Sequence, residues 1–143
     1  KSAELKALGV EFIEQPLPPE ELDAMEEVCR KSVLPVIADE NSIIPGDIPK
    51  LAGRFHGINI KLVKCGGILP ALRMVHLART LGLRVMFGCM IETSILISAA
   101  AQLGPLADYL DLDGNVLIDD DPYAGVENEG GRLSLSEGWV RRR

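Results

Sequence analysis

The segment Gly57-Ile-Asn-Ile-Lys-Leu-Val-Lys-Cys-Gly-Gly67 is the clearest indication of the architecture. Its first five residues form a short β-branched run that ends in a polar residue, and a helical pattern follows over residues 69–81. Side chains alternate between the two faces of a strand, so Asn59 and Lys61 share one face of the expected strand and the isoleucines share the other. One strand followed by one helix is the repeating unit of a parallel α/β sheet.

The same unit recurs along the chain. Further short β-branched runs lie at residues 10–14, 35–39, 84–88 and 109–113. Successive runs begin about 25 residues apart, which is the length of one strand plus one crossover helix. Helical patterns cover residues 18–31, 69–81 and 92–103, with a shorter one at 47–53. After residue 113 the chain becomes irregular, and we expect an edge strand at 132–136. These patterns predict an α/β fold with about five βα units.

Five βα units are too few for a closed (β/α)8 barrel, which takes about 200 residues or more. Polar residues nevertheless stand at the carboxyl ends of the expected strands, and in a barrel these ends form the mouth that carries the chemistry. The chain also starts without a methionine, in what looks like the last turns of a helix that ends at Gly9. We therefore predict one domain that is an incomplete (β/α)8 (TIM) barrel.

Composition argues against two classes of function. The 143 residues are 47% hydrophobic and 25% charged, with a net charge of −6, as in an ordinary globular domain. No apolar run reaches the roughly 18–20 residues of a membrane span. The acidic balance argues against nucleic acid as a partner, because phosphate binding needs a basic surface. The three cysteines lack the spacing of a zinc site or a disulfide framework, which fits the reducing cytoplasm.

Two carboxylates stand at equivalent positions on neighbouring expected strands. Glu14 ends the run 10–14, and Asp39 ends the run 35–39. Such oxygen ligands suit a hard divalent cation such as Mg²⁺, which keeps some of its coordination positions for a substrate. Each carboxylate alone is equally typical of a solvated residue at the start of a loop, but their pairing favours a metal site.

A lysine and an aspartate pair end two further strands. Lys61 ends an apolar strand, where burial and a nearby cation lower the pKa of an ammonium and make it a base near neutral pH. The alternative is a lysine that extends into solvent. Lys64 lies beyond the strand, and we expect it to be a loop charge. Asp111 and Asp113 share a face and suit a cationic group such as an ammonium, although Asp-x-Asp is also typical of an acidic surface.

Taken together, the ordered motifs resemble one known family. They are Ile-Glu14-Gln-Pro, Ala-Asp39-Glu, Ile-Asn-Ile-Lys61 followed by Lys-Cys-Gly-Gly67, and Gly88-Cys-Met-Ile-Glu92-Thr. This series resembles the C-terminal part of the barrel domain of the enolase superfamily, in its muconate-lactonizing branch. The final Asp111-Leu-Asp113 is most similar to the dipeptide epimerases, of which the L-Ala-D/L-Glu epimerases are the best-known type.

The resemblance implies an isomerase that epimerises a dipeptide with the help of Mg²⁺. In this family the metal binds the substrate carboxylate and stabilises the enediolate that forms when the α-proton leaves. At the matching positions, Glu14 and Asp39 are two of three metal ligands, and Lys61 is the acid/base group on one face of the α-carbon. Asp111 and Asp113 bind the α-ammonium of the dipeptide.

The resemblance also implies parts beyond these five residues. Glu92 lies where the family places a polar residue near the site; the alternative is an acid favoured by the dipole of the helix that it opens. Residues 1–143 correspond to the C-terminal portion of the barrel domain, and the capping domain and first strands, with the second lysine and third metal ligand, are absent. We expect the full-length enzyme to be a cytoplasmic homo-oligomer and this chain alone to be inactive.

Two alternatives remain, and the residues argue against a third. Muconate cycloisomerases and o-succinylbenzoate synthase/N-acylamino acid racemases of the same branch share the Lys61 pattern but bind no ammonium. Members similar to mandelate racemase need a histidine after the fourth strand, where this chain reads Gly88-Cys89-Met90. A non-catalytic partial-barrel module is the alternative outside the enzymes, because the open edges of an incomplete sheet favour association.

Overall fold

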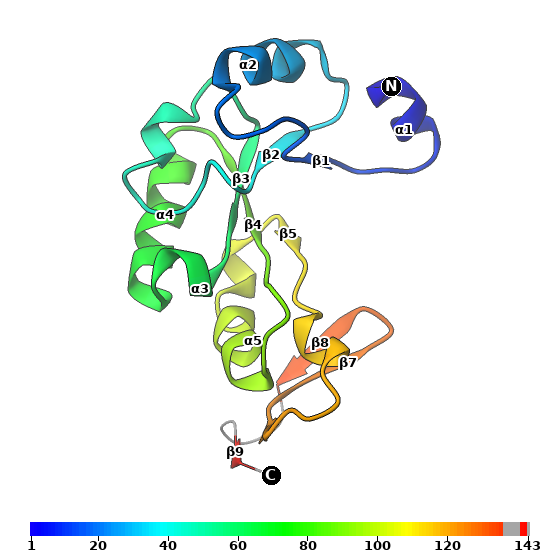
Figure 1. Ribbon diagram of the computed structural model, residues 1–143, viewed down its shortest axis with the longest axis vertical. Helices are drawn as coiled ribbons and strands as arrows, with labels where there is room; N and C mark the ends of the chain where they lie inside the picture. Colours follow the sequence, from blue (N-terminus) through cyan, green and yellow to red (C-terminus); the bar gives the residue numbers. More distant parts are fainter. Residues whose placement is uncertain (136–140, 143) are drawn as a thin grey trace.

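A computed structural model of the protein describes residues 1–135 and 141–142. All five predicted strands form, and they pair in parallel in the order β1-β2-β3-β4-β5. Their bounds are β1 (Ile13–Glu14), β2 (Val36–Ala38), β3 (Gly57–Ile60), β4 (Arg84–Phe87) and β5 (Tyr109–Leu110). The spatial order of the strands follows the chain, as in a (β/α)8 barrel and unlike a doubly wound sheet (Figure 1). The α/β prediction is therefore confirmed.

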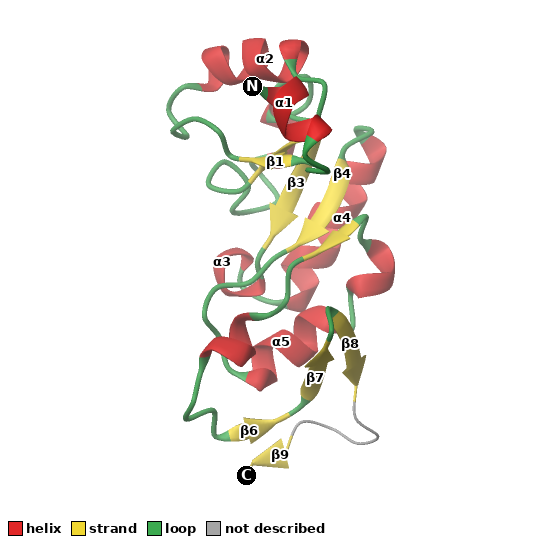
Figure 2. Ribbon diagram, turned by 90° about the vertical axis from the view of Figure 1, so that its right-hand side faces the viewer, coloured by secondary structure: helices red, strands yellow, loops and turns green. Residues whose placement is uncertain are grey.

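Helices connect the strands. They are α1 (Ser2–Ala7), α2 (Leu22–Lys31), α3 (Leu62–Cys65), α4 (Ile68–Thr80) and α5 (Ser94–Ala101), with 3-10 turns η1 (Ile48–Lys50), η2 (Gly104–Leu106) and η3 (Gly114–Leu117). Helix α4 packs against β3 and β4 and lies behind them in Figure 2. Within the described part of the chain, no helix has both the length and the hydrophobicity to cross a bilayer.

Helix α3 is a single turn at a place where no helix is predicted. It begins directly after Lys61 and ends at Gly66, whose φ of 93° is a left-handed conformation that glycine adopts readily. The predicted short helix at 47–53 is reduced to the 3-10 turn η1.

Residues on both faces of the sheet are buried. One face packs with the helices into an apolar core through Val36, Ala38, Ile58, Ile60, Val85 and Phe87. Ile37 and Met86 belong to the opposite face, and they are only 0% and 1% exposed. A parallel sheet that is covered on both faces has strands with continuous apolar runs rather than strict alternation, which explains the sequence pattern.

The segment after residue 113 is more regular than expected. An antiparallel hairpin is formed by β7 (Val126–Glu129) and β8 (Arg132–Leu135), and β6 (Tyr123–Ala124) pairs with β9 (Arg141–Arg142). The hairpin packs against α5 (Figure 2). The predicted edge strand is confirmed as β8 up to residue 135, and residue 136 lies outside the described residues.

Asp121 fixes the start of α5. Its Oδ2 accepts hydrogen bonds from Ser94 N at 2.7 Å and from Ser94 Oγ at 2.6 Å, and its Oδ1 accepts one from Tyr123 N at 3.0 Å. A carboxylate at a helix N-terminus satisfies free amides and interacts favourably with the helix dipole. The expected helix 92–103 therefore begins two residues late, and Glu92 lies in the preceding loop.

Candidate active site at the carboxyl ends of the strands

Four of the predicted site residues lie at the carboxyl ends of the strands. Glu14 is the last residue of β1, Asp39 directly follows β2, and Lys61 directly follows β3. Asp111 directly follows β5 at the edge of the sheet. Because parallel strands end on the same side, the fold brings these residues to one rim, which is where the active sites of (β/α)8 barrels lie.

Both carboxylate oxygens of Asp39 form ion pairs at this rim. Its Oδ2 accepts a hydrogen bond from Lys61 Nζ at 2.8 Å, and its Oδ1 accepts one from Lys64 Nζ at 2.6 Å. The side chains of Asp39, Lys61 and Lys64 are only 10%, 12% and 22% exposed. The expectation that Lys64 is a loop charge is therefore wrong, because the unpredicted turn α3 carries this lysine back over Asp39.

The contacts shift the pKa of both partners. Burial raises the pKa of the Asp39 carboxyl, but the hydrogen bonds and charges of Lys61 and Lys64 outweigh burial and hold this pKa below its ordinary value. Burial lowers the pKa of Lys61, but Asp39, together with the charges of Glu14 and Glu40, raises it above its ordinary value. The predicted low pKa of Lys61 is thus not found here, because carboxylates rather than cations act on its ammonium.

Glu14 is held by a side chain from another strand. Asn59 Nδ2 donates a hydrogen bond to Glu14 Oε1 at 2.7 Å. Asn59 is 1% exposed, and its Oδ1 has no hydrogen-bond partner among the described residues. Gly88 lies against this amide: a Cβ at position 88 would come within 2.6 Å of both Oδ1 and Nδ2. The Asn59 amide therefore occupies space that is free only because residue 88 is a glycine.

Asp111 interacts electrostatically with both Asp113 and Lys61. Burial and the charge of Asp113 raise the pKa of Asp111, whereas the charge of Lys61 lowers it, and the net shift is upward. Both aspartates are exposed. Two neighbouring carboxylates of this kind favour the approach of a cation, because a cation relieves their mutual repulsion.

Glu92 shapes the loop that follows β4. Its Oε1 accepts a hydrogen bond from Met90 N at 3.0 Å, which closes a tight turn. Gly114 packs against the same loop, since a Cβ there would lie 2.1 Å from Met90 O. The loops that carry Glu92 and Asp113 are therefore in contact, and a contact between Glu92 and a substrate stays a prediction.

The rim offers donors that suit Mg²⁺ without forming a complete cage. Within residues 1–135 and 141–142, no group of three or more His, Cys, Asp or Glu side chains is arranged to hold a metal. Mg²⁺ is usually bound through one or two carboxylates, with its remaining positions left to water and substrate. Glu14 and Asp39, on adjacent strands, fit this donor set.

Sequence reasoning gave no role to Gln15. The Gln15 Oε1 accepts a hydrogen bond from Asp39 N at 2.9 Å, so this side chain bridges the ends of β1 and β2. Its position between a strand-ending carboxylate and Pro16 was the available signal.

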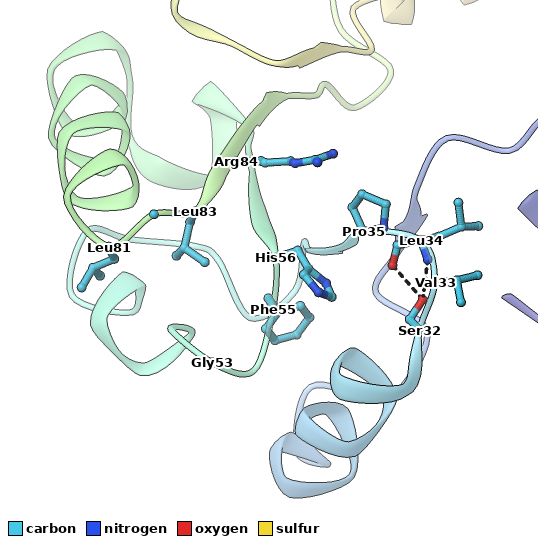
Figure 3. A pocket seen from close by; sticks show the side chains of 11 residues that line it. Ser32, Val33, Leu34, Pro35, Gly53, Phe55, His56, Leu81, Leu83 and Arg84 are labelled. Atoms are coloured by element: carbon cyan, nitrogen blue, oxygen red, sulfur yellow. Dashed lines mark hydrogen bonds between the residues drawn. The ribbon is translucent and has the colours of Figure 1, made fainter. Parts of the chain in front are cut away.

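A separate hollow lies at the opposite ends of the strands (Figure 3). It has a volume of about 500 Å³ and is lined by the segments that lead into β2, β3 and β4, at residues 32–35, 53, 55–56 and 81–83, and by Arg84, the first residue of β4. His56 borders it, and its Nδ1 accepts a hydrogen bond from Val36 N at 3.0 Å. The six predicted site residues do not line this hollow, so the candidate site stays at the carboxyl-end rim.

Known proteins are similar to this chain in sequence. The family model of the Enolase C-terminal domain-like proteins matches residues 2–139. The chain is 51% identical over 135 residues to an L-Ala-D/L-amino acid epimerase from Flavobacterium johnsoniae. The aligned region covers 94% of this chain and 40% of that protein. It is 52% identical over 133 residues to an L-Ala-D/L-Glu epimerase from Bacteroides thetaiotaomicron, and this aligned region covers 93% of this chain and 35% of that protein. The chain thus spans well under half the length of these relatives.

A solved structure shares the fold. The dipeptide epimerase from Methylococcus capsulatus, complexed with Mg and the dipeptide L-Arg-D-Lys, has a TM-score of 0.82 and 38% identity, over 94% of this chain and 40% of that one. The predicted partial (β/α)8 barrel and the resemblance to dipeptide epimerases are therefore confirmed. Because the family model covers nearly all of its residues, the chain belongs to the Enolase C-terminal domain-like family.

Proposed function

We propose that residues 1–143 are the C-terminal portion of the barrel domain of a Mg²⁺-dependent dipeptide epimerase. Support comes from the relatives, which are L-Ala-D/L-amino acid and L-Ala-D/L-Glu epimerases with 51% and 52% sequence identity to this chain. The chain covers 40% or less of each of these relatives, so the activity is proposed for the whole protein. A capping domain and earlier barrel strands would complete the site there.

The position of Lys61 is the observation that carries this proposal. Its ammonium lies at the rim, 2.8 Å from Asp39 Oδ2, and it is mostly buried. A general base must lie within hydrogen-bond reach of the proton that it removes, and a substrate bound by the strand-end carboxylates would lie within reach of this lysine. Lys61 is the proposed acid/base group on one face of the substrate α-carbon.

Glu14 and Asp39 are the proposed metal ligands of this chain. Bound Mg²⁺ would withdraw charge from the substrate carboxylate and so acidify the α-proton. Asn59 keeps Glu14 in place, and Lys64 holds the second oxygen of Asp39. Neutralising Glu14 and Asp39 would remove two of the three carboxylate charges that now raise the pKa of Lys61, which brings its amine closer to the range of a useful base.

Asp111 and Asp113 are the proposed binding site for the α-ammonium of the dipeptide. The raised pKa of Asp111 indicates that its charge is poorly compensated without a ligand. An ammonium would compensate it and would orient the first residue of the dipeptide. Glu92 is proposed to support the neighbouring loop at the substrate side.

Epimerisation needs a proton donor and acceptor on each face of the α-carbon, and this chain offers Lys61 for one of them. We propose that the second lies in the remainder of the whole protein. The cytoplasm is the proposed compartment, which agrees with the three free thiols Cys29, Cys65 and Cys89. A racemase of N-acylated amino acids is the second candidate within the same branch, and the aspartate pair argues against it.

The test is exchange of the α-proton in heavy water. The whole protein with Mg²⁺ is incubated with a dipeptide library and, separately, with N-acylated amino acids, and deuterium incorporation is followed by NMR. We expect incorporation into dipeptides and inversion at one α-carbon. Exchange confined to N-acylated amino acids, or no exchange with either class, would overturn the proposal.

A further inference from the structure

We propose that Gln15 is a positioning residue that fixes the Glu14 and Asp39 carboxylates relative to each other for metal binding. This inference rests on the proposed function of the rim. Gln15 follows Glu14 in the chain, and its side chain reaches the backbone of Asp39 on the neighbouring strand. One residue therefore touches the main chain of both proposed ligands.

The side chain of Gln15 is bonded at both ends. Its Oε1 accepts a hydrogen bond from Asp39 N at 2.9 Å. Its Nε2 donates one bond to Leu17 O at 3.0 Å and another to Asn41 Oδ1 at 2.6 Å. A side-chain amide can accept one hydrogen bond and donate two at once, as here, which no aliphatic side chain of the same size can do.

Asn41 extends the connection. It lies two residues after Asp39, and its Nδ2 donates a hydrogen bond to Pro19 O at 2.8 Å. Together, Gln15 and Asn41 cross-link the loop after β1 with the loop after β2, and we name this pair the amide clamp. The clamp lies directly beside the proposed ligands, so movement between the two loops would change the separation of the carboxylates.

The backbone of Gln15 shows the cost of this arrangement. Its φ of 34° is the one positive value at a non-glycine residue among the described residues. The left-handed region is disfavoured for such side chains, and the residue before a proline normally adopts an extended conformation. Backbone strain of this kind persists where the surroundings over-determine it, which is common at functional sites. Here the three side-chain bonds and the ladder bond from Gln15 N to Ile37 O at 2.9 Å determine it.

The backbone pairing of β1 with β2 is too short to fix the position of Glu14 by itself. Strand β1 has two residues, and it pairs with β2 through Ile13 opposite Val36 and Glu14 opposite Ile37. Where this pairing ends, one residue beyond Glu14, the side-chain hydrogen bonds of the amide clamp connect the two strands instead. Residues that orient metal ligands without binding the metal commonly change metal affinity by 10–100-fold when they are mutated.

The experiment compares four single variants of the whole protein, and the double variant Gln15→Met/Asn41→Ala, with wild type. Gln15→Met removes all three side-chain bonds at nearly constant volume, and Asn41→Ala removes one partner of Gln15. Gln102→Met is the matched control, because Gln102 is exposed at the end of α5. Asp39→Asn tests the ligand itself. The dissociation constant for Mg²⁺ is measured by calorimetry without substrate, and the rate of α-proton exchange is measured as Mg²⁺ is increased.

We expect Gln15→Met to bind Mg²⁺ about 10–100-fold more weakly and to recover most of its rate at high Mg²⁺. Asn41→Ala should weaken binding in the same direction, and the double variant should be little weaker than Gln15→Met, since the two share one hydrogen bond. Wild-type affinity in Gln15→Met, or in Asn41→Ala if Gln15→Met does not fold, would overturn the inference. If wild type binds no Mg²⁺, or Asp39→Asn binds it equally well, the proposed function of the rim fails instead.

Discussion

Asn59 on β3 donates a 2.7 Å hydrogen bond to the carboxylate of Glu14 on β1, across the intervening strand β2. The bond spans 45 residues of sequence and joins two strands that are not neighbours. It is possible because Asn59 points away from the helix-covered core, and because Gly88 on the far side leaves room for its amide. The orientation of Glu14 therefore depends on a residue that lacks any side chain.

Gly88→Ala should displace the Asn59 amide and release Glu14. The added methyl group would lie 2.6 Å from Oδ1 and Nδ2, which requires the amide to move. We expect a loss of about 1–3 kcal/mol in the free energy of unfolding, as for other overpacked sites, and weaker binding of Mg²⁺. The matched control is Gly46→Ala, where a Cβ would meet Ile44 Cδ1 at an ordinary 3.9 Å. Equal effects of the two substitutions in denaturant titration and calorimetry would contradict this account.

Lys61→Ala in the whole protein should lower the rate of epimerisation by about 10²–10⁴-fold, the usual contribution of a general acid/base. Mg²⁺ binding should survive, because Lys64 still holds Asp39. Rate and metal affinity are measured on the same preparation, with Lys50→Ala, an exposed lysine on η1, as the control. A variant that keeps its rate would remove Lys61 from the catalytic role.

Asp113→Asn should weaken the binding of dipeptides much more than that of N-acylated analogues, which have no ammonium. A hydrogen bond to a charged group contributes about 1.5–3 kcal/mol, so the KM for dipeptides should rise by about 10-fold or more. Asp119→Asn, an exposed aspartate on the following loop, is the control. If both classes of substrate are weakened equally, the aspartate pair does not bind the ammonium.

The stability of the fold should fall in acid because of Asp39. Its pKa is lower in the folded protein than in the unfolded chain, so its contribution is complete above about pH 4 and is lost as pH falls through the folded value. Lys61 behaves in the opposite sense: its raised pKa contributes stability below about pH 10.4, which is lost as pH rises further. Unfolding is followed by denaturant titration across both ranges. Asp39→Asn should remove the acid dependence of this site, and an unchanged profile would show that other groups cause it.

The order and type of the sheet could be predicted from the sequence because they depend on local patterns. Each strand is a short β-branched run, and the interval of about 25 residues leaves room for one crossover. Apart from the strand β8, the segment from 114 to 135 could not be predicted in this way. Its strands β6 and β7 have two and four residues and carry few buried side chains, so they give no periodic signal.

The positions of Glu14, Asp39 and Lys61 on one rim could also be predicted, since the end of a strand is a local feature. The contacts of Lys64 and Gln15 could not. Lys64 reaches Asp39 through a single helical turn that is too short to show periodicity. The hydrogen bond of Gln15 to Asp39 depends on how close the fold brings two residues that are 24 positions apart in the sequence.

Lys61 and Lys64 reach the two oxygens of one carboxylate because α3 turns the chain between them. Each added residue rotates a helix by about 100°. An insertion or deletion of one residue in this segment would therefore turn Lys64 away from Asp39, although every charge would still be present. Val63, which is 54% exposed, can vary in type, but it cannot be removed. The length of this segment is thus as strictly determined as the identity of its two lysines.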